Sequence, residues 1–175
     1  MMKNKENQRD FISRAGTTMT IVAWIIFLLI LFGVFDYLIS QRNNPNQNIV
    51  TTINGYQQEI VLQRNSYGHY VSSGTINNHE VTFLLDTGAS DIAIPESIAN
   101  SVGLSKGRAI VVKTANGNAK AYQTRLDSVA VGDIKLYDLN ATILPNITGD
   151  EILLGMSFLK HFEIIQKGKT LTIKQ

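Results

Sequence analysis

An uncharged stretch of 21 residues, Ala15 to Phe35, limits what this chain can fold into more than any other feature. As an α-helix it would be about 31 Å long, close to the ~30 Å of hydrocarbon in a bilayer. A signal peptide has a shorter apolar region that leads to a small-residue cleavage site, and no good site of that kind follows here. We therefore expect an uncleaved transmembrane helix over residues 15–39, in preference to a signal peptide or the buried helix of a soluble domain.

The charges around this stretch predict its orientation. Arg42 is the lone cation just after it, whereas four precede it: Lys3, Lys5, Arg9 and Arg14. By the positive-inside rule, residues 1–14 form a cytoplasmic tail and the C-terminal domain lies outside, which in a bacterial cell is the periplasm.

Beyond a polar, Asn-rich linker at residues 40–48, the pattern changes to short apolar runs separated by turn residues every 8 to 12 positions. This spacing is typical of an all-β sandwich or barrel, and we expect one β-domain over residues 49–175 with short helices at 95–102 and 156–161. The domain has 11 Lys/Arg and 11 Asp/Glu, and the chain has no cysteine. Disulfides, a thiol nucleophile and a basic nucleic-acid surface are thereby excluded.

One apolar run ends abruptly in an acid, in the segment Phe83-Leu-Leu-Asp-Thr-Gly-Ala-Ser90. A carboxylate at the exit of a buried strand is costly to desolvate unless chemistry or a partner needs it there. The hydroxyl of Thr87 can hold a tight turn, and Gly88 lets backbone N–H groups approach the carboxylate without a Cβ in the way. Asp86 is therefore the first candidate for a catalytic residue.

This segment resembles the active-site motif of the retropepsin-like aspartic proteases, and Ile152-Leu-Leu-Gly155 resembles the second marker of that family. The resemblance runs from about Asn48 to the C-terminus and is close to a bacterial, membrane-anchored branch. It implies a retropepsin-like closed β-barrel on a bacterial inner membrane, peptide-bond hydrolysis without a cofactor, and Asp86 as the catalytic acid. It also implies an active-site loop of Thr87, Gly88, Ala89 and Ser90, with Leu153, Leu154 and Gly155 packed beneath it.

A hairpin is predicted at Asn116-Gly117, because both residues tolerate the positive φ of a type I′ turn. The resemblance implies that this hairpin is a flap over the substrate cleft, formed by Thr114, Ala115, Asn116 and Gly117. An ordinary surface hairpin fits the same residues.

A single Asp-Thr-Gly cannot supply both carboxylates of an aspartic protease, and no other acid repeats the setting of Asp86. The resemblance therefore implies a homodimer with one Asp86 from each copy, acting on peptides or proteins. The terminal strands, at 49–53 and 170–174, would either help to form the dimer interface or remain simple edge strands. Two positions that are commonly charged in viral members hold Ser90 and Met156, so the ion pair that braces the viral dimer is missing.

Other classes of site fit the sequence less well. The three histidines, His69, His79 and His161, lack metal-ligand spacing, and no Gly-x-Ser-x-Gly elbow is present. The main alternative is a membrane-tethered module of the same fold that binds peptides or proteins without cutting them, because folds persist while activities vary.

Overall fold

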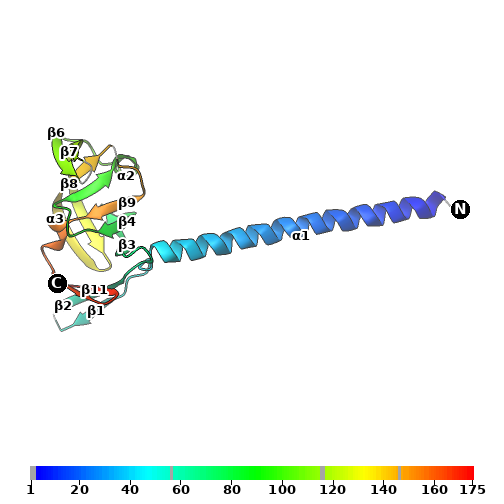
Figure 1. The fold of residues 1–175 in the computed structure, drawn as a ribbon, viewed down its shortest axis with the longest axis horizontal. Helices are drawn as coiled ribbons and strands as arrows, with labels where there is room; N and C mark the ends of the chain where they lie inside the picture. The colour runs from blue at the N-terminus through cyan, green and yellow to red at the C-terminus, as the bar shows by residue number, and fades with distance from the viewer. Residues whose placement is uncertain (1–2, 56, 115–116, 146) are drawn as a thin grey trace. The chain divides into compact units, whose positions relative to one another are not determined.

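The computed structural model describes residues 3–55, 57–114, 117–145 and 147–175, and divides into the units Met1–Gln41 and Arg42–Gln175 (Figure 1). Helix α1 (Lys3–Asn43) is continuous over 41 residues and extends past both ends of the predicted span. The most apolar 18-residue window in its segment Thr18–Asn43 has a mean hydropathy of 2.6 and is nowhere buried. By length and composition this helix can cross a membrane, a test that an N-terminal signal sequence also passes.

The second unit contains a seven-stranded sheet with the strand order β3-β4-β9-β5-β8-β7-β6. Strands β4 and β9 run parallel, as do β5 and β8. Two residue pairs between β3 and β7 also connect the first strand of the sheet back to β7. The strands are β3 (Val71–Ile76), β4 (His79–Leu85), β5 (Ile92–Pro95), β6 (Ala109–Thr114), β7 (Gly117–Val131), β8 (Ile134–Leu144) and β9 (Glu151–Leu154).

A smaller antiparallel sheet has the order β1-β2-β11-β10, formed by β1 (Thr51–Asn54), β2 (Gln57–Gln63), β10 (Glu163–Lys167) and β11 (Thr170–Lys174). Its register places Ile60 beside Ile173 and Leu62 beside Leu171. All four side chains are buried in the core. Side chains alternate between the two faces of a strand, so residues two positions apart point to the same face. This face of the sheet therefore packs against the core.

Two short helices complete the domain, α2 (Glu96–Ser101) and α3 (Met156–Leu159). Ala99 of α2 and Phe158 and Leu159 of α3 are buried in the same core as the strand residues. The predicted mostly-β domain with two short helices is therefore confirmed. The four-residue strands β5 and β9 were not predicted.

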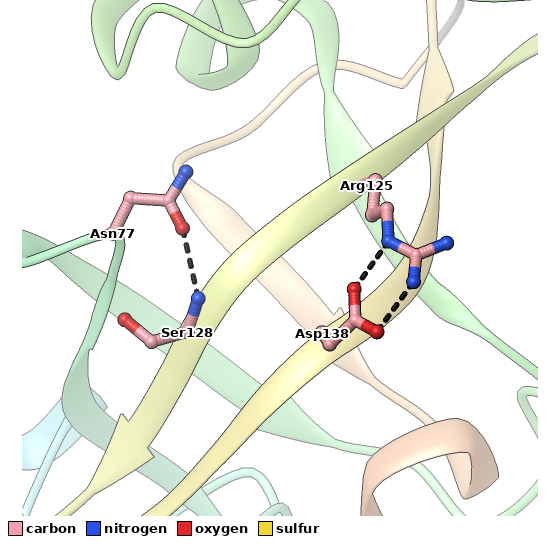
Figure 2. Close-up of polar contacts among 4 residues, drawn as sticks. All are labelled: Asn77, Arg125, Ser128 and Asp138. Atoms are coloured by element: carbon pink, nitrogen blue, oxygen red, sulfur yellow. Dashed lines mark hydrogen bonds and ion pairs between the residues drawn. The ribbon is translucent and has the colours of Figure 1, made fainter.

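The long hairpin of β7 and β8 is fixed by polar contacts on its surface (Figure 2). The side-chain oxygen of Asn77 accepts a hydrogen bond from the Ser128 backbone N–H at 3.0 Å. Arg125 and Asp138 form a two-pronged ion pair across the strands, and the hydrogen bond from Arg125 lowers the pKa of Asp138. Asp138 has a φ of 62°, in the left-handed region, so the ladder is interrupted there. From the sequence alone, four short strands are expected at 119–126, 128–131, 134–137 and 141–144, where the structure has the two long strands β7 and β8.

Much of the expected linker at residues 40–48 is structured, because its first four residues continue α1. The Asn46 side chain is buried: its Nδ2 donates to Gln63 O at 2.9 Å and to Val71 O at 2.6 Å, and its Oδ1 accepts from Gln63 N at 2.6 Å. Asn44 is also buried, and its Oδ1 accepts from the Asn46 N–H at 3.0 Å. From Asn44 onward the chain is therefore hydrogen-bonded into the second unit, which we call the β-unit.

Candidate active site

Asp86 follows the last residue of β4 and begins a tight turn. Its backbone N–H donates to Leu154 O at 3.2 Å, and its backbone oxygen accepts from Ala89 N at 3.2 Å. The carboxylate oxygen Oδ1 accepts a hydrogen bond from the Gly88 N–H at 2.8 Å. The side chain is half-buried, whereas Thr87 and Gly88 are exposed. The turn thus holds one carboxylate oxygen in place and leaves the other free of contacts within the turn itself.

The loop from Asp86 to Asp91 joins β4 to β5, and both of these strands pair with β9. Leu85 lies beside Leu154 in the parallel ladder, and Ala93 lies beside Leu153 in the antiparallel one. The two sequence markers, which are more than 60 residues apart, therefore meet at the end of β9.

Gly155 lies directly beneath this loop. A Cβ on Gly155 would come within 2.2 Å of Asp91 O and 2.6 Å of Ala89 O, both backbone atoms. Its φ of −90° is open to any residue, so close approach alone requires glycine here. The next residue, Met156, donates its N–H to Ala89 O at 2.8 Å, and Ser157 donates to Ser90 O at 3.0 Å. These contacts fix the loop against the first turn of α3.

A groove of about 790 Å³ lies between this loop and the β6–β7 hairpin. Gly88, Ala89 and Ser90 line one side of it, and Leu153 contributes from β9. On the hairpin side its lining is both apolar and polar: Ile110, Val112, Lys113 and Thr114 of β6, with Asn118 and Ala119 of β7. Asp86 itself is outside the lining, at the edge of the loop.

The candidate flap is only partly described by the structure, because Ala115 and Asn116 lie outside the described residues. Thr114 pairs with Gly117, and the Thr114 hydroxyl donates to Gly117 O at 2.8 Å. Gly117, with a φ of 106°, is therefore the first residue of β7 and not a central residue of the turn as the sequence had indicated.

Sequence reasoning missed several residues of the groove, among them Asp91, Ile110, Val112, Leu144 and Ile147. The apolar run at residues 109–112 indicates the strand β6, but it does not show which of its residues face the groove. No comparable pattern marks the contributions from Asp91 or Ile147.

One acid near the site, Glu151, has a shifted pKa. Burial raises the pKa of the Glu151 carboxyl at the start of β9, and the charge of Asp150 adds to the rise, while His69 opposes it. Among the described residues, no three His, Asp or Glu side chains gather so that they could hold a metal ion. The acidic side chains of the loop are those of Asp86 and Asp91.

Comparison with known proteins agrees with this geometry. Residues 72–161 match the family model described as gag-polyprotein putative aspartyl protease, which is half of the chain and contains both markers. The chain belongs to this family of retropepsin-like aspartic proteases. The crystal structure of a retropepsin-like aspartic protease from Rickettsia conorii is 28% identical, with a TM-score of 0.55 over 73% of this chain and 94% of that one.

Two relatives extend the similarity beyond the matched segment. A Sinorhizobium protein encoded in the cobV 5′ region is 32% identical over 159 residues, which cover 83% of this chain and 68% of that protein. A Rickettsia prowazekii protein is 29% identical over 165 residues, covering 86% of this chain and 68% of that protein. Family and fold together support a protease function for this aspartic protease domain.

Proposed function

We propose that this protein is a membrane-anchored aspartic endopeptidase in which Asp86 carboxylates from two copies activate one water molecule. The observation that carries the proposal is the position of Asp86, at a turn held by Gly88 and by the end of β9, beside a groove. Family membership and the similar Rickettsia conorii structure support it.

The chemistry needs two acids in different protonation states. One carboxylate accepts a proton from the attacking water, while the other, protonated, polarises the peptide carbonyl. Two carboxyl groups about 3 Å apart cannot both ionise, so they share a proton and titrate as a pair. This behaviour is general to aspartic proteases and is not deduced from this chain.

A second copy is the natural source of the other carboxylate. Among the described acids, Asp86 alone begins a turn that is held in this way by a glycine N–H and by β9. A two-fold axis between two copies would bring the two turns together. If α1 crosses the membrane with its N-terminus in the cytoplasm, both domains are confined to one outer surface. Confinement of this kind raises their effective concentration, so a weak dimer can still form.

The test uses the full chain, reconstituted in liposomes and supplied with a peptide library between pH 4 and 7. Asp86→Asn keeps the size of the side chain and removes its acid–base chemistry, so we expect cleavage to fall at least about 100-fold. The control is Asp127→Asn, which changes an exposed acid of β7. Peptide binding without cleavage by either the wild type or Asp86→Asn would favour the non-catalytic binding module instead.

Mixing wild type with Asp86→Asn tests the shared site. Each mixed dimer holds one intact acid and is inactive. With equal amounts and random pairing, about one quarter of the dimers keep both acids. Activity should therefore fall to about a quarter of that of undiluted wild type, whereas a site complete in one copy would retain half.

A further inference from the structure

A well-ordered loop, Arg64–His69, follows β2 and presents an exposed aromatic ring. Asn65 organises it: its Oδ1 accepts from the Tyr67 N–H at 3.0 Å and from the His69 N–H at 2.9 Å. Arg64 Nε donates to Gly68 O at 2.6 Å. The loop holds Tyr67 at its tip with 73% of its surface exposed. Tyr67 is therefore a surface residue and not part of the core.

The loop lies where the chain leaves α1. Asn65 Nδ2 donates to the backbone oxygen of Asn43, the last residue of α1, at 3.0 Å. Arg42, one residue earlier, is exposed. The next residue, Asn44, donates from Nδ2 to Ser73 Oγ at 3.1 Å. The loop therefore borders the point at which the β-unit is attached to the helix.

Cations gather around this point. The Arg64 N–H donates to Lys169 O at 2.8 Å, which places the β10–β11 turn and its exposed Lys167 and Lys169 next to the loop. In the part of the chain that the structure describes, no ion pair involves Arg42, Arg64, Lys167 or Lys169. We call these four cations, together with Tyr67, the basic edge.

Acids of the same sheet lie at its opposite end. Glu163 and Glu59 flank Lys174 across the strands, and Lys174 pairs with Glu59 at 3.5 Å. Lys167 is four positions after Glu163 in β10, about 14 Å along the strand. Glu151 interacts electrostatically with His69, the last residue of this loop. The sheet is thus positive at the end that carries the Arg64–His69 loop.

The connection to α1 is short. The last apolar residue of α1, Ile39, is five residues before Asn44, where the β-unit is fixed. Even a fully extended chain of five residues spans at most about 18 Å. The polar layer of a bilayer is roughly 5–8 Å deep on each side, and ionic attraction acts over about another 8–10 Å. With α1 in a membrane, the basic edge therefore stays within reach of the phosphates of that membrane.

We propose that the basic edge binds the anionic phosphate head groups of the bilayer that holds α1, and so fixes which side of the protease domain faces the membrane. The proposal rests on the membrane anchor of the proposed function. Arg and Lys side chains supply attraction to acidic lipids, and tyrosine is enriched at the boundary between head groups and hydrocarbon.

The absence of cysteine and the single tryptophan of the chain allow a clean test. In full-length protein, Ser66→Cys carries the fluorophore NBD next to Tyr67, and Gln57→Cys carries it at the other end of β2. The proteins are reconstituted in phosphatidylcholine vesicles with or without 30% phosphatidylglycerol. A lipid with a nitroxide on its head group quenches an NBD that touches the surface. Trp24, which lies in α1, reports insertion through quenching by brominated acyl chains.

We expect strong quenching of NBD at residue 66 in the anionic vesicles only, little quenching at residue 57, and quenched Trp24 in both vesicles. Lys167→Gln with Lys169→Gln should lower the ratio of docked to free domain about 30-fold at low ionic strength. Lys135→Gln with Lys160→Gln, the same charge change elsewhere, should leave that ratio unchanged. Quenched Trp24 with no lipid-dependent signal at residue 66 would overturn this inference alone. Unquenched Trp24 would overturn the anchor, and this inference with it.

Discussion

The side chain of Asn46 offers the sharpest test of how the β-unit is held together. It makes three buried hydrogen bonds, two as donor to Gln63 O and Val71 O and one as acceptor from Gln63 N. Each such bond contributes about 1 kcal/mol net, and buried backbone groups left without partners cost more. Asn46→Ala should therefore lower the free energy of unfolding by about 3 kcal/mol, a large part of the 5–15 kcal/mol that is usual for a domain.

Hydrogen exchange of the full chain in detergent micelles measures this loss. The most protected amides of β2 and β3 should exchange about 150-fold faster in Asn46→Ala, the factor that corresponds to 3 kcal/mol. Asn140→Ala is the matched control, because Asn140 is exposed and belongs to β8, not to the segment after α1. If Asn46→Ala changed exchange no more than Asn140→Ala, the segment after α1 would be a free linker and the reasoning would be wrong.

Two further predictions concern the strand beneath the active-site loop. Gly155→Ala places a Cβ against the Asp91 backbone oxygen, so we expect it to displace the loop that carries Asp86 and abolish cleavage, with a loss of stability of at least about 2 kcal/mol measured by urea unfolding. Glu151 has a raised pKa, so the folded state holds its proton more tightly than the unfolded state, and stability falls as the pH rises from 4.5 through the folded pKa. Glu151→Gln should remove that decline, which thermal unfolding at a series of pH values would reveal.

The sequence predicted those parts of the structure that depend on local pattern. The apolar helix, the alternating strands of the small sheet and the two short helices all follow from residue spacing. Strands β5 and β9 were missed because each is short and lies next to a helix, so no separate apolar run marks it. Their pairing with distant strands, rather than their own sequence, makes them strands. The resemblance of the two markers to a family predicted their proximity, which no local pattern contains.

The prediction for residues 40–48, after the expected membrane span, was wrong in the opposite direction: a free linker was expected where the structure is hydrogen-bonded. An Asn-rich segment has the composition of a solvated linker, and composition cannot distinguish an exposed asparagine from one that is buried against backbone groups. Asn46 is buried because the ends of β2 and β3 offer it unpaired backbone partners, and these partners exist only after the strands have come together. The prediction that Gly117 is a central residue of the hairpin turn was wrong for a related reason. The pairing of Thr114 with Gly117 depends on the register along the whole of β6 and β7.

The position of β9 explains how one chain holds the Asp86 carboxylate in place. The loop that begins at Asp86 leaves β4 on one side of β9 and enters β5 on the other, so it must cross over the end of β9. This crossing fixes the turn against Gly155 and makes its backbone rigid enough to hold a carboxylate through the Gly88 N–H. A second rigid acid in the same chain would need a second crossing of this kind. The loop from β8 to β9 also crosses the end of a strand, β5, but among its described residues no acid accepts a hydrogen bond from a glycine N–H as Asp86 does. This difference is the physical ground for seeking the partner carboxylate in another copy.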